Sequence, residues 1–312
     1  MDRKNRIALL IFAAVILLFP LLPLNVYYLS IMIFVGINTI IATGLCMLMG
    51  YAGQISLGHA AFYGLGAYTS GILTTRCGLG PWPAMVMAAL FTASVAFVVG
   101  MPTLKLRGHY LAMATLGFGE IVFISFNELI DLTGGPSGFG DIPNIRIFGH
   151  TLDSDISYYF FVWAIAWLIF LFSMNIIHSR VGRALRSIHG SETAANAMGV
   201  NVSRFKLQIF VLSAVYASLA GSLYAHFITF LSPGTFGLMF SILLLIMVVV
   251  GGRHSLWGAV LGAAILTFLP EYLRVFKDYD VLIYGAILLS MVMFLPRGLA
   301  GCIPDVVCRW LR

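Results

Sequence analysis

The chain has 312 residues, of which 60% are hydrophobic and 10% charged, whereas about 25% of the residues in ordinary soluble domains are charged. This composition predicts an integral membrane protein and leaves no room for a sizeable soluble domain. The net charge of +6 follows from the membrane topology proposed below, so no nucleic-acid partner is expected. The cysteines show no metal-binding or redox spacing, and we predict no metal site.

A helix needs about 20 mostly apolar residues to cross a bilayer, and ten stretches of the sequence meet or approach this length. We predict an all-α integral membrane protein of about ten transmembrane or broken helices, forming one polytopic domain over residues 1–312. The first stretch is interpreted as an uncleaved span because no small-x-small cleavage site follows it. The predicted spans are 7–22, 29–49, 58–75, 83–101, 109–130, 157–177, 207–231, 236–251, 257–273 and 281–296.

Residues 50–67, GYAGQISLGHAAFYGLGA, contain five glycines and no Asp, Glu, Lys or Arg. Helix-weakening sequence is tolerated at membrane depth only where it is buried in protein or lines a cavity, and glycine lets one backbone approach another closely. The segment therefore predicts a broken or tightly packed helix at the heart of a protein that moves a solute. The candidate residues of the translocation path are Gly50, Gly53, Gln54, Ser56, Gly58 and His59.

Glu120 is the one acidic residue well inside a predicted span. Ionisable groups at that depth are costly and are functional candidates by default, so Glu120 joins the candidate path. It could instead make a structural contact with His109, His59 or a backbone group. We interpret His59 and His226 as hydrogen-bonded packing residues in preference to ligands.

Small residues recur every four positions on several predicted helices. Such stripes let helices pack closely in lipid, and we favour packing over pore lining for them. The stripes comprise Ser56, Ala60 and Gly64; Ser213, Ala217, Gly221 and Ala225; and Gly258 with Gly262. A faint internal echo is also present, because Gly53-Gln-Ile-Ser-Leu is followed three residues later by Ala60, as Gly252-Arg-His-Ser-Leu is followed by Ala259.

The distribution of basic residues predicts which segments face the cytoplasm. With ten spans, both termini lie on one side, and positive charge collects on the cytoplasmic side of membrane proteins. Of the 18 basic residues, 14 fall in segments that are inside if both termini are cytoplasmic, and only Arg76, Arg146, Arg274 and Lys277 are left outside. The inside set is Arg3, Lys4, Arg6, Lys105, Arg107, Arg180, Arg183, Arg186, Arg204, Lys206, Arg253, Arg297, Arg309 and Arg312.

The longest inside segment, residues 178–206, is basic and partly helical. Apolar residues repeat in it at helical spacing; Ser191-Glu-Thr-Ala is typical of a helix start, and Gly199 of a helix stop. We predict a stiff cytoplasmic coupling element whose alanines sit deep in a cleft of a partner. The chain itself contains no phosphate-binding loop, metalloprotease motif or nucleophile elbow, so any ATPase must be another chain.

The sequence resembles the permease subunits of branched-chain amino acid ABC importers, within them the LivM type, from about residue 30 to 300. The motifs that carry the resemblance stand in order along the chain. They are Gly50-Tyr-Ala-Gly-Gln-Ile-Ser-Leu-Gly-His-Ala-Ala-Phe, Arg107-Gly-His-Tyr-Leu-Ala-Met-Ala-Thr-Leu-Gly-Phe, Leu132-Thr-Gly-Gly-Pro-Ser-Gly, Val181-Gly-Arg-Ala-Leu-Arg-Ser-Ile, Glu192-Thr-Ala-Ala-Asn-Ala-Met-Gly-Val-Asn and Lys206-Leu.

The resemblance implies a multi-pass protein of the bacterial inner membrane that forms half of a translocation path for branched-chain or other neutral amino acids. Its implied partners are a second, LivH-like permease, two cytoplasmic ABC ATPases that bind ATP and Mg, and a periplasmic amino-acid-binding protein. No catalytic residue and no cofactor is implied for this chain. The implied ATPase-coupling loop contains Arg183, Arg186, Glu192, Ala194, Ala195 and Gly199, with Thr193 inserted relative to the family's Glu-Ala-Ala pattern.

Two alternatives stay open at the level of sequence. Related permeases carry urea or short amides, so the sequence specifies the type of transporter more firmly than it specifies the solute. An autonomous, ion-coupled secondary transporter would instead use Glu120 as its coupling residue and the break at 50–67 as its binding site.

Overall fold

We describe a computed structural model of the chain, in which residues 3–21, 26–106, 108–147, 150–152, 154–273, 280–294 and 298–301 are described. Several residues used in the charge count lie outside this part of the chain, namely Arg107, Arg274, Lys277, Arg297, Arg309 and Arg312.

A helix is present at each of the ten predicted spans. They are α1 (Arg3–Leu18), α2 (Val26–Cys46), α3 (His59–Thr75), α4 (Pro81–Thr103), α5 (His109–Glu128), α7 (Asp155–His178), α10 (Val202–Ile228), α11 (Leu238–Gly251), α12 (Leu256–Leu273) and α13 (Asp280–Phe294). Six of the described helices are long and apolar enough to cross a membrane: α2 with its extension to Tyr51, α4, α5, α7, α10 and α12. The predicted helical membrane architecture is thus confirmed, while the number of helices that span remains a prediction.

The connections hold the remaining elements. These are η1 (Phe19–Leu21), η2 (Met47–Tyr51), α6 (Ile130–Thr133), η3 (Gly135–Ser137), α8 (Arg180–Gly190), α9 (Glu192–Ala197) and η4 (Pro233–Phe236). The described residues also include one small hairpin, which the sequence did not predict: β1 (Arg146–Ile147) pairs antiparallel with β2 (His150–Thr151).

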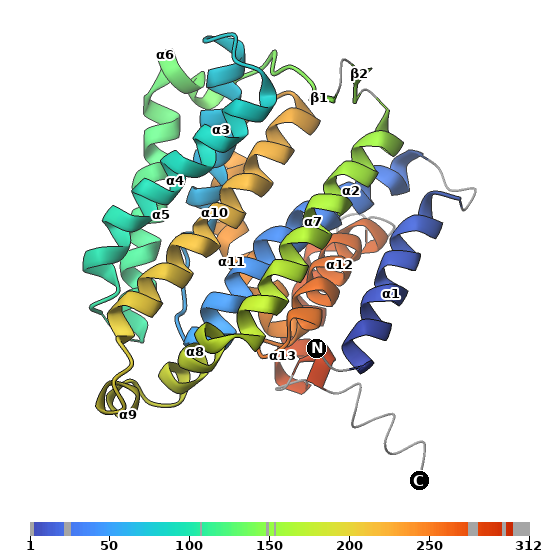
Figure 1. The fold of residues 1–312 in the computed structure, drawn as a ribbon. Coiled ribbons are helices and arrows are strands. Elements are labelled where there is room, and N and C mark those ends of the chain that lie inside the picture. Colours follow the sequence, from blue (N-terminus) through green and yellow to red (C-terminus); the bar gives the residue numbers. More distant parts are fainter. Residues whose placement is uncertain are drawn as a thin grey trace.

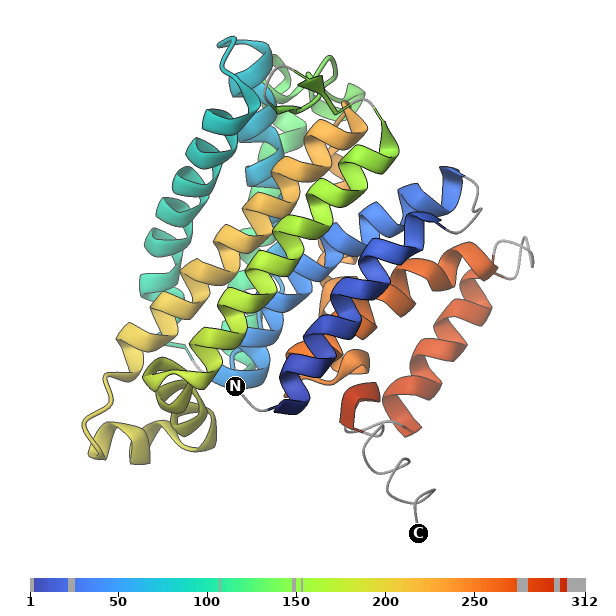
Figure 2. The same ribbon diagram turned by 45° about the vertical axis from the view of Figure 1, so that its right-hand side comes forward.

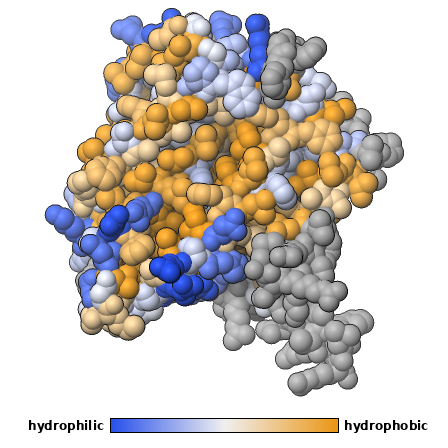
Figure 3. Space-filling view, in the orientation of Figure 1, coloured by the Kyte–Doolittle hydropathy of each residue, from blue (hydrophilic) through white to orange (hydrophobic). Residues whose placement is uncertain are grey.

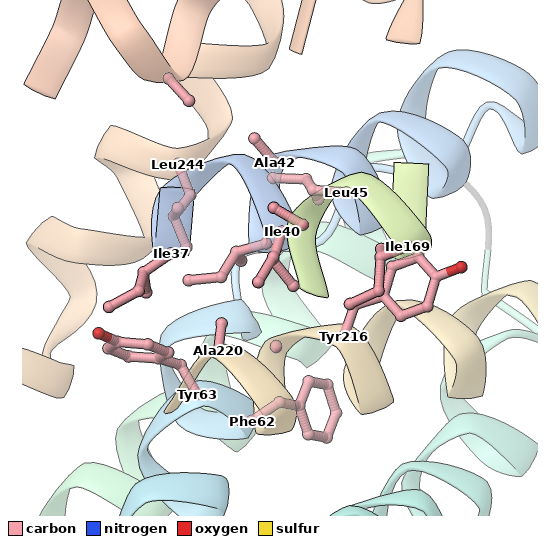
Figure 4. Close-up of a cluster of buried hydrophobic side chains, with 14 of the residues drawn as sticks. Ile37, Ile40, Ala42, Leu45, Phe62, Tyr63, Ile169, Tyr216, Ala220 and Leu244 are labelled. Carbon is pink, nitrogen blue, oxygen red and sulfur yellow. The ribbon is translucent and has the colours of Figure 1, made fainter. Parts of the chain in front are cut away.

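Helix α2 forms the centre of the bundle. Its apolar window is 89% buried, against 22% for α5 at the periphery, and it packs against α7, α10, α11 and α12. Large apolar side chains of α2 interlock with those of its neighbours around Ile37, Ile40 and Leu45, all at most 1% exposed (Figure 4). A helix hydrophobic all round is expected only where it is surrounded by protein or lipid, and α2 is surrounded by protein.

The connections separate into two groups at opposite ends of the bundle (Figures 1 and 2). One end carries α8, α9, the start of α1 and the end of α13, and we call it the inner end. The other carries α6 and the hairpin, and we call it the outer end. Backbone bonds tie the outer connections together, as in the paired residues Phe139 and Leu231. On the face shown in Figure 3, a broad apolar band lies between the ends, with hydrophilic residues toward both ends.

Candidate functional site: a helix break and the α8–α9 element beside it

The predicted break is present, and it is narrower than the glycine-rich segment. Helix α2 widens into the π-helical turn η2 and stops at Ala52, and the chain is non-helical from Gly53 to Gly58. Gly53 has φ of +69°, a left-handed conformation that glycine adopts readily. Helix α3 begins at His59, so residues 59–67 are helical despite their glycines. They are helical because close packing against α10 compensates for weak helix propensity.

Backbone-to-backbone contacts explain two of the glycines in the break. A Cβ at Gly50 would lie 1.6 Å from the carbonyl oxygen of Arg253, and one at Gly58 would lie 2.7 Å from that of Thr115. The side chain of Thr115 also accepts a 3.0 Å bond from the backbone N–H of Leu57. These positions are filled by protein, so they leave little room for a solute at the inner end.

His59 is held between two serines and is buried. Its Nδ1 lies 3.1 Å from Ser56 Oγ and its Nε2 lies 2.6 Å from Ser213 Oγ on α10. A neutral imidazole offers one donor and one acceptor, and both nitrogens have a hydroxyl partner. The break is thereby fastened to α10, and His59 is not paired with Glu120.

Gln54 is the unsatisfied polar group of the break. It is 2% exposed, its backbone N–H donates to the carbonyl of Leu48, and neither its side-chain nitrogen nor its side-chain oxygen has a partner among the described residues. Buried amides without partners are rare in folded proteins. The break therefore contains one residue whose side chain is poorly accommodated in this conformation.

Glu120 lies beside the break, but no hydrogen bond or ion pair among the described residues joins it to the break. It is exposed on α5, at the rim of a cavity of about 10 Å³ next to Leu57 and Ser241, which is too small for an organic solute. The described part of the chain offers it no ion pair, so the predicted structural partnership with His59 or His109 is not found. Among the described residues, no cluster of side chains could hold a metal ion.

The internal echo corresponds to a second chain reversal beside the first. Helix α11 ends at Gly251, Gly252 has φ of +120°, and α12 starts at Leu256. Both reversals therefore begin at a glycine with positive φ and lie at the inner end. They touch directly, since Cys46 Sγ lies 3.4 Å from the carbonyl oxygen of Arg253 and the hydroxyl of Tyr51 donates to that of His254 at 3.1 Å.

The small-residue stripes lie at helix crossings. A Cβ at Gly221 would lie 1.9 Å from the carbonyl oxygen of Tyr63 on α3, and one at Gly262 would lie 1.9 Å from that of Met247 on α11. Gly258 likewise approaches the carbonyl oxygens of Gly251 and Gly252. The other stripe residues are also buried, namely Ser56, Ala60, Gly64, Ser213, Ala217 and Ala225.

The predicted coupling loop forms two short helices, α8 and α9. The helix over residues 192–197 has the predicted start: Ser191 caps it, accepting a bond from the backbone N–H of Ala194 at 3.3 Å. It also has the predicted stop, because Gly199 follows with φ of +81°. Arg183 is exposed, whereas Arg186 ties α8 to the end of α7 by donating to the carbonyl of Ile177 at 2.9 Å.

The expectation that Ala195 sits in a partner's cleft needs correction. Ala195 is 3% exposed and packs with Ile188 and Val202 in a small apolar core, so its role lies in the element's own fold. The exposed residues of α9 and its end are Thr193, Ala194, Asn196, Ala197 and Met198. Met198 is 84% exposed, so these are the residues available to a partner.

An ion pair that the sequence analysis missed fastens α9 to α10. The ammonium of Lys206, almost fully buried, pairs with the carboxylate of Glu192. Fourteen residues separate them, which is beyond the i,i+4 spacing that a sequence pattern can flag. Their shared presence in the family motifs was the only available signal.

Helix α8 also contacts the break. A Cβ at Gly53 would lie 2.8 Å from Nδ1 of His189, and the rings of His189 and His254 meet edge-on at 5.4 Å. Partial burial, His254 and Arg253 together lower the pKa of His189. His189 is thus the residue at which α8 meets both chain reversals.

Comparison with known proteins identifies the family of this chain. The family model described as a permease component of branched-chain amino acid transport systems matches residues 27–293. The chain belongs to this family. The LivM permease of Salmonella typhimurium is 34% identical over 286 residues, which cover 84% of this chain and 67% of the relative.

LivM of Escherichia coli K12 has the same identity and coverage, whereas LivH of that strain is 24% identical over 284 residues, covering 84% of this chain and 90% of the relative. All three are named as permease proteins of high-affinity branched-chain amino acid transport systems. No solved structure matches the chain. The resemblance read from the motifs is therefore confirmed.

Proposed function

We propose that this chain forms half of the translocation path of an ATP-driven importer for branched-chain or other neutral amino acids. It would pair with a second permease subunit in the inner membrane of a bacterium, with both termini and the α8–α9 element in the cytoplasm. A periplasmic binding protein would deliver the solute, and two ATPase chains would bind ATP and Mg. Family membership supports an ATP-driven importer with these partners, and the 14-to-4 division of basic residues supports the orientation.

The observation that carries the coupling role is the contact of α8–α9 with the helix break. Ser179, Ser191 and Asn201 each cap a helix through a side-chain oxygen, and the Glu192–Lys206 pair fixes the element to α10. A stiff element can transmit a rigid-body movement to the break through His189 and Gly53, whereas a flexible loop cannot. ATP changes the conformation only by binding one state more tightly than the other.

Substitutions on the exposed face of α9 test this role. Ala197→Arg should detach or uncouple the ATPases and abolish uptake of labelled leucine while the permease still inserts at normal levels. The matched control is Arg183→Ala on exposed α8, which should reduce ATPase attachment less. Normal uptake by Ala197→Arg with the ATPases still attached would place the coupling surface elsewhere.

The solute and the partners can be tested together. We expect a strain lacking this gene to lose uptake of leucine, isoleucine and valine but to retain urea uptake, and we expect ATPase chains to co-purify with the tagged permease. A secondary transporter would purify alone and would depend on an ion gradient. Glu120 is exposed and borders, with Leu57 of the break, a cavity of about 10 Å³, which is too small to be the binding site of such a transporter.

A further inference from the structure

A larger cavity lies at the outer end of the bundle, away from the break. It has a volume of about 450 Å³ and is bounded by α2, α3, α10, η4, α11 and α12, within the about 300–1,000 Å³ of small-molecule sites. Its position follows from the chain path. Because Gly50 of α2 touches Arg253 before α12 at the inner end, the early part of α2 and the late part of α12, which line the cavity, lie toward the outer end.

The cavity has an apolar wall and a polar wall. Phe34, Phe240, Leu243 and Met247 form the first. The second includes Asn38, Thr267 and Glu271, and the Asn38 amide donates to Thr267 Oγ1 at 2.9 Å. Pro270 also lines this wall, and because proline lacks an N–H, the carbonyl of Leu266 loses its helical donor.

Glu271 is the one charged residue among the described residues that line the cavity, and no Lys, Arg or His is among them. Glu271 already interacts within the protein. A carboxylate has about four acceptor sites, so it can accept from an ammonium group in addition to such a partner. Such a site favours a positive charge and disfavours acidic solutes.

Tyr63 supplies a second polar group from the opposite side. Its side chain is 2% exposed and lines the cavity, and its hydroxyl makes no hydrogen bond with the described residues. In Figure 4 the Tyr63 ring extends away from the packed cluster, with its hydroxyl at the far end. A tyrosine hydroxyl can both donate and accept a hydrogen bond, so the Tyr63 hydroxyl is able to bind a molecule in the cavity.

We propose that this cavity binds a neutral amino acid with an aliphatic side chain, in its zwitterionic form. The ammonium faces Glu271 and the carbonyl of Leu266, the carboxylate accepts bonds from Tyr63 and Thr267, and the side chain packs on Phe240 and Leu243. This assignment rests on the proposed function, and it places the solute's binding site at the outer end of this subunit and not at the helix break.

Binding to the assembled importer tests the polar contacts. In the permease–ATPase complex in lipid nanodiscs, Glu271→Gln and Tyr63→Phe should each weaken binding of labelled leucine by about 10–100-fold, as expected for a lost bond to a charged group. The matched controls are Glu128→Gln and Tyr272→Phe, because both residues are exposed and outside the cavity. These controls should bind leucine as the wild type does.

A labelling experiment tests the site without relying on those side chains. With the other accessible cysteines replaced, saturating leucine should slow modification of Leu243→Cys by a thiol reagent at least about tenfold, since an occupied site is protected in proportion to its occupancy. Glutamate should not protect it. Met239→Cys is the control, because Met239 is 80% exposed on the same helix and should react equally with and without leucine.

The outcomes separate the two claims. If the wild-type importer carries no neutral amino acid, the proposed function fails. If it carries leucine, but Glu271→Gln and Tyr63→Phe behave like their controls and leucine leaves Leu243→Cys unprotected, the proposed function stands and the cavity assignment is overturned.

Discussion

The inner and outer ends of the helix bundle differ in how closely their backbones approach. At the inner end, Gly50, Gly251 and Gly258 bring main chains into direct contact. At the outer end, the same helices, α2, α11 and α12, leave a cavity of about 450 Å³. The difference teaches that these glycines set where the helices cross and thereby set where they separate. A hollow forms because rigid helices that touch at one end diverge toward the other.

The largest effect is expected where a side chain is forced into the inner crossing. Gly50→Ala places a Cβ 1.6 Å from the carbonyl oxygen of Arg253, and overpacking of a core costs about 1–3 kcal/mol and occasionally more. We expect loss of folded protein in detergent, measured by size-exclusion chromatography of a fluorescent fusion. Gly117→Ala on α5 is the control because nothing lies within 4 Å of its Cβ. Equal yields of the two variants would contradict the tight crossing.

Replacing a leucine by the larger phenylalanine should affect stability differently at the two ends. Leu45 is fully buried in the packed cluster (Figure 4), so Leu45→Phe should destabilise the protein by about 1–3 kcal/mol. Leu243 lines the cavity, and Leu243→Phe should change stability little but reduce leucine uptake. Thermal unfolding of both variants and uptake by the second would measure this. A strongly destabilised Leu243→Phe would mean that the outer end is as full as the inner one.

A stabilising substitution is expected within the break. Gln54 is buried with an unpartnered amide, and relieving such a group is worth about 1–3 kcal/mol, so Gln54→Met should raise the melting temperature. Gln208→Met on α10, which replaces an exposed residue, should leave it unchanged. If Gln54 acts in the transport cycle, uptake falls although stability rises. A lower melting temperature for Gln54→Met would show that the amide has a partner in the membrane.

The smallest effect is expected from pH at the inner junction. The pKa of His189 is lowered, first by partial burial and then by His254 and Arg253, so the packed state favours neutral His189. An unperturbed histidine has a pKa of about 6.5. As pH falls below this value, the state in which His189 has left its contact with Gly53 binds a proton more readily than the packed state does, so the contact weakens. The protection of the backbone amides of residues 53–58, measured by hydrogen exchange relative to the intrinsic exchange rate at each pH, should therefore fall between about pH 7 and 5.5, and His189→Gln should abolish this change in protection.

Much of the architecture could be predicted from local sequence. Each apolar stretch became a helix, because apolar length and the need to satisfy backbone groups internally act within one segment. The caps of α9 could also be predicted, since Ser191 and Gly199 act on neighbouring backbone groups. The break at Gly53 was visible for the same reason, and residues 59–67 form the tightly packed helix that was the other interpretation of this segment.

The partners of these local elements were decided only by tertiary structure. No pattern in the sequence brings Gly50 to Arg253, pairs Glu192 with Lys206, or turns Ala195 inward, because each contact joins segments whose relative position depends on the whole bundle. The cavity lined by Tyr63 and Glu271 is the clearest case. Its lining residues come from six separate elements, and a hollow is the space that packing leaves, which no single segment encodes.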